Sequence, residues 1–354
     1  MTAPQWRMPA EFAPQRRVWM AWPSSGYVLG ENPQEAEETR TAWAAVANAI
    51  AEYEELVMVI DPEARDIARR YLSESIMTIE EPLNDAWMRD FGPTFVLGAD
   101  GELGAVDWRF NGWGAQEWAR WDRDELIGAA VAGHADATLI TSPLVNEGGG
   151  INVDGKGTVL ATLAVQLDPG RNPGITTAEV EAEFARTIGA TKTIWVPRGL
   201  YRDAMPPGTR GHIDIVATFT ESGHVVVHDQ PDPAHPDHEI MREITAILER
   251  STDATGAPLD VVRLAGPTVL KDDEDEFVDY SYINHVVING AVIIPAFGDP
   301  RDEEAAALLA DLYPGREMRL VESRPIFRQG GGIHCITQQE PLSGADGVGG
   351  VAGG

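Results

Sequence analysis

The single cysteine of this sequence, Cys335, lies in the stretch GGGIHCITQQEP, directly after a histidine and close behind three glycines. A lone cysteine is most often a small apolar core residue, because free cysteine is among the most buried residue types. It acts as a nucleophile instead when the fold brings an acid or a base to its sulfur. If the stretch is a strand, His334 faces away from Cys335, since successive side chains alternate between the two faces. A partner for the thiol is therefore expected elsewhere in the chain.

The best candidate partner is His212, in the stretch GHIDIVATF. Asp214 follows it by two positions, and residues two apart on a strand share a face. An imidazole beside a carboxylate can give and take a proton at the thiol; a strand-edge histidine satisfied by its neighbour is the structural alternative. Further histidines follow at spacings that fit neither a helical zinc pair nor a cysteine-containing zinc pattern, so we expect no metal. These are His224, His228, His235 and His238.

Carboxylates and an aromatic residue gather in the stretch NDAWMRDFGPTF, where Asp85 and Asp90 flank Trp87. Such a group can cradle a planar cation, because the carboxylates accept hydrogen bonds in its plane and the indole packs against its face. The structural alternative is an internal pair between Arg89 and a carboxylate beside a buried tryptophan. Glu147 precedes three glycines in NEGGG, and the lack of a following Lys-Ser/Thr pair argues against a phosphate loop.

A weak internal repeat connects these residues. Segments 89–108, 146–163, 211–229 and 280–297 each read as a polar residue, a strand, a tight turn and a second strand, and a helical segment follows most of them. The Asp-Gly and Asn-Gly turns among them strongly favour hairpins. Segment 330–339 would open a fifth unit. If the units surround a pseudo-symmetric axis, the residues that open them meet in one central pocket. These are Asp90, Glu147, His212, Asn284 and Cys335.

Composition limits the class of protein. The 354 residues carry a net charge of −29, which argues against nucleic-acid binding and is compatible with a cationic substrate. One cysteine allows no intrachain disulfide, and no stretch is apolar enough for a signal peptide or a membrane span, so we expect a cytoplasmic enzyme or binding protein. No Pro-, Gly- or Ser-rich linker divides the chain. Residues 1–342 are therefore expected to form one catalytic domain, and the Gly-rich residues 343–354 a disordered tail.

Five stretches carry a resemblance to a known family: NDAWMRDFGPTF, NEGGG, GHIDIVATF, SYINHVVINGAVIIPAFGD and GGGIHCITQQEP. Together they resemble the agmatine deiminase and bacterial-type peptidylarginine deiminase family over nearly the whole chain. The resemblance implies an α/β pentein fold, a five-bladed ββαβ propeller with pseudo-fivefold symmetry. It implies that Cys335 is the nucleophile and His212 the general acid and base. It also implies that Asp90 and Asp214 hold the guanidinium group, and that Glu147 supports the histidine.

The resemblance further implies hydrolysis of a guanidinium group through a cysteine thiouronium intermediate to a ureido product and ammonia, without a metal or organic cofactor. The expected reaction converts agmatine to N-carbamoylputrescine, in polyamine biosynthesis. Another substrate, such as an ω-guanidino acid or the C-terminal arginine of a peptide, stays open, as do an amidinotransferase and a non-catalytic guanidine-binding protein. We expect a small cationic partner and neither nucleic acid nor membrane; the sequence leaves open whether the chain forms a homo-oligomer.

Two positions depart from the agmatine deiminase pattern in ways that affect the substrate. Arg210 stands before Gly211, where an acid-rich stretch is usual, and an arginine there would favour a carboxylate over an amine. The alternative is that Arg210 points to solvent. Gly332 stands where the agmatine branch usually has asparagine. The residues expected to contact the substrate are Trp87, Asp90, Asp214, Asn284, Arg210 and Gly332.

Overall fold

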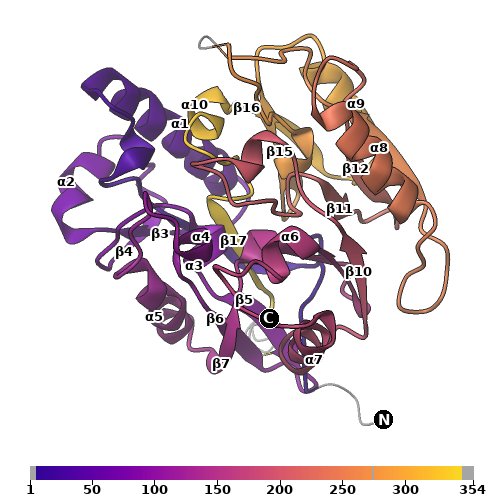
Figure 1. Ribbon diagram of the computed structural model, residues 1–354. Coiled ribbons are helices and arrows are strands. Elements are labelled where there is room, and N and C mark those ends of the chain that lie inside the picture. The colour runs from indigo at the N-terminus through magenta and orange to yellow at the C-terminus, as the bar shows by residue number, and fades with distance from the viewer. Residues whose placement is uncertain (1–4, 273–274, 345–354) are drawn as a thin grey trace, which may run out of the picture.

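The computed structural model describes residues 5–272 and 275–344. Within these residues the chain is a mixed α/β protein whose strands form five small sheets. Each sheet contains an antiparallel strand pair and a further parallel strand that follows a helix. Figure 1 shows the longer helices α5, α7, α8 and α9 toward the periphery, with β17 near the centre. From residue 345 onward the expected tail lies outside the described residues.

Four of the sheets contain the hairpin and the following helix that the sequence repeat predicts, and a parallel strand then completes each sheet. The first contains β5 (Thr94–Gly98), β6 (Leu103–Arg109), α5 (Ile127–His134) and β7 (Thr138–Val145), with β1 (Trp6–Arg7) beside β5. The second contains β8 (Ile151–Val153), β9 (Thr158–Thr162), α7 (Thr177–Thr187) and β10 (Lys192–Val196). The third contains β11 (Ala217–Phe219), β12 (Val225–Asp229), α8 (Asp237–Leu248) and β13 (Val261–Ala265). The fourth contains β14 (Val286–Ile288), β15 (Ala291–Ala296), α9 (Asp302–Leu312) and β16 (Glu317–Glu322).

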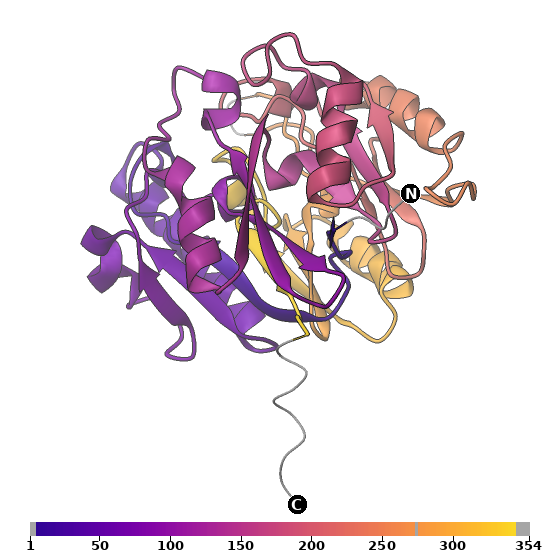
Figure 2. The ribbon, with the colours of Figure 1, turned by 90° about the horizontal axis from the view of Figure 1, so that it is seen from below.

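The fifth sheet joins the two ends of the described chain. Strand β17 (Thr337–Pro341) pairs antiparallel with β2 (Gln15–Ala21), and Thr337 lies opposite Met20. Parallel pairing then adds β3 (Leu56–Ile60) and β4 (Met77–Glu80), with α1 (Pro33–Ala51) between β2 and β3. Figure 2 shows the yellow C-terminal strand beside the indigo N-terminal one. The loop that carries Cys335 is thus anchored by the N-terminal part of the chain.

Shorter helices connect these units. The α-helical turns are α2 (Arg65–Ala68), α3 (Met88–Phe91), α4 (Gly112–Ala115), α6 (Leu163–Gln166) and α10 (Arg324–Phe327). The 3-10 turns are η1 (Tyr27–Leu29), η2 (Pro62–Ala64), η3 (Asp124–Leu126), η4 (Gly148–Gly150), η5 (Arg202–Ala204) and η6 (Tyr282–Asn284). Side-chain caps start two of the longer helices: Asn32 accepts from two amides at the start of α1, and Thr176 forms a capping box at the start of α7.

Burial follows the position of each strand in its sheet. The inner strands β3 and β9 are buried at every position, as expected for strands covered on both faces. The edge strand β4 is largely exposed. None of the described helices is long and apolar enough to cross a membrane.

The structure corrects one local expectation: His212 and Asp214 do not lie on a strand, because they precede β11 in a turn. The backbone N–H groups there are satisfied locally, with that of His212 donating to Asp203 and those of residues 213 and 214 donating to the carbonyl of Gly149. Cys335 likewise precedes β17, so strand alternation does not decide where His334 points. In both segments the strand pairing of β11 or β17 begins only after the candidate site residues.

Candidate active site

Backbone hydrogen bonds tie together loops that are far apart in the sequence. The amide of Arg89, in α3, donates to the carbonyl of Cys335 over 3.1 Å. The amide of Ile213 donates to the carbonyl of Gly149 over 3.2 Å, and that of His334 to the carbonyl of Asn284 over 3.2 Å. The segments that open all five sheet units are therefore fastened at one place, and their polar side chains are buried there.

Gly149 marks the point where these side chains converge. A methyl group on its Cα would lie 2.5 Å from Nδ1 of His212, 2.9 Å from Oδ2 of Asp214 and 3.1 Å from Oδ1 of Asp90. These distances leave no room for any side chain, so glycine is required at this position. The predicted residues His212, Asp214 and Asp90 thus surround one small space.

Cys335 borders the same space and is buried. Its Sγ lies 3.3 Å from Nδ2 of Asn284 and 3.6 Å from Oδ2 of Asp214. Burial raises the pKa of the Cys335 thiol well above its usual range, and the carboxylates of Asp214 and Asp90 raise it further. The amides of Gly332 and Asn284 act in the opposite direction. Without an added positive charge, the sulfur is therefore a thiol rather than a thiolate.

His212 is held as a cation by buried carboxylates. Its Nε2 lies 3.1 Å from Oε2 of Glu147, and its Nδ1 lies 3.7 Å from Oδ1 of Asp90. Burial alone would lower the pKa of His212, but Asp90 and Glu147 outweigh it and raise the pKa to about 9. Arg171 donates from Nε to both oxygens of Glu147, at 2.9 and 3.0 Å. Despite burial, Arg171 and His212 lower the pKa of Glu147 to about 2, so this carboxylate is always charged near neutral pH.

Each of the two carboxylates near the thiol has one occupied oxygen and one free oxygen. Oδ2 of Asp90 accepts from Nε1 of Trp113 over 2.9 Å, and Oδ2 of Asp214 accepts from Nδ1 of His334 over 2.8 Å. Oδ1 of Asp90, Oδ1 of Asp214 and Nδ1 of His212 are buried and have no hydrogen-bond partner. Buried polar atoms are normally paired, so two carboxylate oxygens without a donor beside a thiol indicate a space for a ligand with several N–H donors.

Trp87 lies beside the nucleophile. A methyl group on Gly331 would lie 2.6 Å from the ring of Trp87 and 3.2 Å from Cβ of Cys335, so the indole borders the loop of the thiol. Nε1 of Trp87 donates to the hydroxyl of Tyr27 over 2.7 Å, and the ring packs edge-on against Trp43 at 5.3 Å. These contacts fix the plane of the indole.

Arg210 and Gly332, the two positions that differ from the agmatine deiminase pattern, both lie against other residues of the protein. Nη1 of Arg210 forms an ion pair with Oδ2 of Asp168 at 2.7 Å, and the side chain remains partly exposed. Asp168 also pairs with Arg171 at 2.9 Å. At Gly332, a methyl group would lie 2.4 Å from Oδ1 of Asn284, which leaves no space for an asparagine in this chain. Arg210 therefore contributes to the network behind His212.

Four residues of the site were not singled out from the sequence: Arg171, Asp168, Trp113 and Glu11. His334 was considered only as a partner of the thiol and set aside. Trp113 lies between two glycines in NGWG, and these glycines were the available signal of a turn; in the structure Trp113 has a positive φ of 56°. Arg171 and Asp168 lie in the stretch DPGRNP, whose Pro and Gly residues indicate a loop but no contact with Glu147. His334 and Glu11 meet over 323 positions, and no local pattern indicates such a contact.

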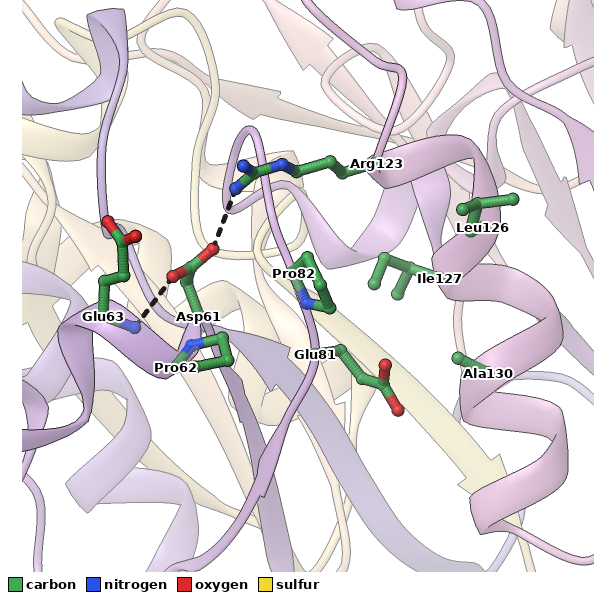
Figure 3. A pocket seen from close by; sticks show the side chains of 9 residues that line it. All are labelled: Asp61, Pro62, Glu63, Glu81, Pro82, Arg123, Leu126, Ile127 and Ala130. Atoms are coloured by element: carbon green, nitrogen blue, oxygen red, sulfur yellow. Dashed lines mark hydrogen bonds and ion pairs between the residues drawn. The ribbon is translucent and has the colours of Figure 1, made fainter.

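A separate cavity of about 460 Å³ lies between α5 and the loops after β3 and β4. Figure 3 shows its lining, in which Arg123 pairs with Asp61 over 3.2 Å while Leu126 and Ile127 supply an apolar wall. The lining contains no cysteine or histidine, so this cavity offers no nucleophile. Within the described part of the chain, no three or more histidine, cysteine, aspartate or glutamate side chains are grouped so that they could hold a metal ion.

The sequence matches the family model described as Porphyromonas-type peptidyl-arginine deiminase over residues 7–341. A Streptomyces coelicolor protein named "Putative agmatine deiminase" is 53% identical over 335 residues, covering 95% of this chain and 98% of that protein. Agmatine deiminase of Pseudomonas fluorescens is 36% identical, covering 94% and 95%. The solved structure of the agmatine deiminase of Enterococcus faecalis superposes with a TM-score of 0.88 at 32% identity, covering 95% and 96%.

Proposed function

We propose that this chain, which belongs to the Porphyromonas-type peptidyl-arginine deiminase family, is a guanidine deiminase: a hydrolase that cleaves a C–N bond of a guanidinium group and releases ammonia. The observation that carries the proposal is the pair of buried, unpartnered carboxylate oxygens of Asp90 and Asp214 beside the thiol of Cys335. A guanidinium cation presents several N–H donors in one plane, and charge-assisted hydrogen bonds to two carboxylates would hold that plane in place.

The chemistry begins with binding. The guanidinium donates to Oδ1 of Asp90 and Oδ1 of Asp214, and its positive charge lowers the pKa of the nearby thiol, which releases its proton to solvent. The sulfur of Cys335 then attacks the central carbon, forming a C–S bond and a tetrahedral intermediate. His212 gives the proton on Nδ1 to the departing nitrogen, the C–N bond breaks, and ammonia leaves. An S-alkylthiouronium group remains on the cysteine.

Hydrolysis completes the reaction. His212, now neutral, takes a proton from a water molecule, whose oxygen attacks the thiouronium carbon and forms a C–O bond. The C–S bond then breaks, the sulfur leaves as a thiolate, and loss of the hydroxyl proton gives the neutral ureido product. Glu147 stabilises the protonated form of His212 in each half of the cycle. None of these steps requires an electron acceptor or donor.

Agmatine is the substrate that we propose, giving N-carbamoylputrescine. The relatives that are 36% and 53% identical carry the agmatine deiminase name. The ion pair between Arg210 and Asp168 also supports this choice, because a neutralised arginine has little to offer the carboxylate of an ω-guanidino acid. An amidinotransferase would use the same thiouronium group and pass it to an amine. A non-catalytic binding protein would have no use for a thiol between two carboxylates.

We also propose that the five sheets are the blades of a closed pentein propeller, that residues 1–342 act as one catalytic domain, and that the enzyme works in the cytoplasm. The repeated hairpin, helix and parallel strand support the first two statements. A homo-oligomer is compatible with them and can be tested by light scattering. Roles for Cys335, His212, Asp90, Asp214, Glu147, Trp87, Asn284 and Gly332 are part of the same proposal.

The test is to incubate the protein with agmatine, arginine, 4-guanidinobutyrate and a peptide that ends in arginine, and to measure ammonia and the ureido product. Agmatine is expected to be turned over, and Cys335→Ala is expected to be inactive on every compound. Preferential turnover of 4-guanidinobutyrate would instead assign a carboxylate-bearing substrate. Transfer of the amidino group to an added amine, without ammonia-producing hydrolysis, would refute the hydrolase assignment.

A further inference from the structure

His334 is buried between two carboxylates. Its Nδ1 lies 2.8 Å from Oδ2 of Asp214, and its Nε2 lies 2.8 Å from Oε2 of Glu11. A carboxylate oxygen accepts hydrogen bonds, so both ring nitrogens act as donors here, and only the protonated ring has two N–H groups. Glu11 and Asp214 both raise the pKa of His334, against the effects of burial and Arg89. The geometry therefore indicates an imidazolium ion.

Glu11, which binds the ring nitrogen of His334 opposite to that bound by Asp214, is itself fixed by further contacts. Its Oε1 accepts from the backbone amide of Val287, in β14, over 2.7 Å. Nη2 of Arg89 lies 3.9 Å from its Oε2. Although Glu11 is buried, His334 and Arg89 lower its pKa to about 2, so it keeps its charge at any pH where the protein functions.

This arrangement determines which oxygen of Asp214 remains for a ligand. Oδ2 is occupied by His334 and lies 3.6 Å from Sγ of Cys335, while Oδ1 is the atom without a partner. Rotation of the carboxyl group would break the hydrogen bond to His334. The cation of His334 also offsets the negative charge of Asp214 next to the thiol.

Resting on the proposed function, we infer that Glu11 and His334 are positioning residues: Glu11 keeps His334 an imidazolium ion, and this ion orients Asp214 toward the guanidinium group and limits its effect on the charge of Cys335. Neither residue contacts the reacting carbon in this arrangement. The N-terminal segment that carries Glu11 is thereby part of the active-site support.

The geometry indicates in which direction removal of the charge of Glu11 changes the pKa of the Cys335 thiol. In Glu11→Gln the ring of His334 loses its second carboxylate partner and releases a proton. The positive charge that disappears lies closer to Sγ than the negative charge of Glu11, because His334 shares Oδ2 of Asp214 with the thiol. The thiol should therefore be harder to ionise. The other charged or titratable groups around His334 and Asp214 are Arg89, His212, Asp90 and His285.

The first measurement is the rate at which iodoacetamide alkylates the wild type and Glu11→Gln, from pH 7 to 10, followed by mass. Cys335 is the only cysteine, so the added mass reports this thiol alone. We expect alkylation of Glu11→Gln to be about tenfold slower at a given pH, corresponding to a change of about one pKa unit. The second measurement is the pH dependence of kcat/KM for agmatine: KM should rise more than kcat falls, and the deficit of Glu11→Gln relative to the wild type should grow as the pH is lowered, because fewer thiols ionise.

Glu54→Gln is the matched control. Glu54 also accepts from a backbone amide of the β14–β15 hairpin, that of Asn289 over 3.1 Å, but both ring nitrogens of His334 are bound by Asp214 and Glu11 instead. It should leave the alkylation rate and the pH profile unchanged, and melting temperatures of both variants verify that each is folded. His334→Gln should slow alkylation as Glu11→Gln does.

Equal alkylation rates in wild type and Glu11→Gln would overturn the inference. It would also be overturned if Glu54→Gln slowed alkylation as much as Glu11→Gln does. If the wild type turns over no guanidine compound, the proposed function fails, and the alkylation rates still decide the role of Glu11.

Discussion

Replacing Glu147 with glutamine tests whether the charge state of His212 controls the reaction. Glutamine keeps the shape of glutamate and can still accept a hydrogen bond from Arg171, but it removes the negative charge 3.1 Å from Nε2 of His212. Arg171 keeps its ion pair with Asp168 at 2.9 Å, so no buried cation is left without a partner. We therefore expect Glu147→Gln to fold.

The size of the effect follows from the pKa of His212. At about 9, close to nine tenths of His212 is protonated at pH 8. An opposite charge within hydrogen-bond distance accounts for about 1 to 3 pKa units, so its loss should bring His212 to about 7, where only about a tenth is protonated at pH 8. Because departure of ammonia needs the proton on His212, kcat/KM at pH 8 should fall about tenfold, and much less at pH 6.

The assay is the release of ammonia from agmatine as a function of pH, with wild type and Glu147→Gln at equal concentrations. The basic limb of kcat/KM should move down by about two pH units. Glu183→Gln is the control, since Glu183 also pairs with an arginine, Arg186, but lies on α7 away from the thiol. A basic limb that stays in place in Glu147→Gln would refute the role that we assign to this carboxylate.

Three further predictions concern the same space. Cys335→Ser should lower kcat by a factor on the order of 10⁴ or more, measured by ammonia release, because no other residue of the site supplies a comparable nucleophile. Gly149→Ala should lower kcat/KM about 100-fold, since the methyl group would lie 2.5 Å from Nδ1 of His212; a fully active variant would mean that the three polar atoms do not surround the substrate. Burial raises the pKa of Asp90 to about 6, so kcat/KM should fall as pH drops through about 6, where protonation removes the charge that holds the cation; a pH profile that stays flat down to pH 5 would contradict this. In each case the melting temperature of the variant or sample shows whether it remains folded.

The sequence repeat predicted the hairpins and the helices that follow most of them, because turn residues and apolar periodicity are local signals, whereas the third strand of each unit was implied only by the family resemblance. It also predicted that Asp90, Glu147, His212, Asn284 and Cys335 open the units and converge, and the structure brings these side chains together. The conformation at these residues was predicted incorrectly. Turns and 3-10 helices stand where strands were expected, since side chains and carbonyls from other loops satisfy the backbone amides there.

The supporting residues could not be predicted for a different reason. The contact of Glu11 with His334 and that of Arg171 with Glu147 join segments whose separation carries no periodic signal, and each depends on how the sheets pack. Arg210 illustrates the same limit. Its charge suggested a receptor for a carboxylate, whereas the structure pairs it with Asp168, a residue that no local pattern connects with it.

The raised pKa of the Cys335 thiol is compatible with a nucleophilic role because the proposed substrate carries the missing charge. In the free protein the nearby carboxylates of Asp90 and Asp214 disfavour a thiolate, so the sulfur is protected from chance electrophiles and oxidants. A bound guanidinium cation pairs with both carboxylates and reverses this effect at the moment when attack is required. The ureido product is neutral, so it can neither maintain the thiolate nor bind two carboxylates as strongly as the cation does. The same arrangement of charges therefore favours activation by the substrate and release of the product.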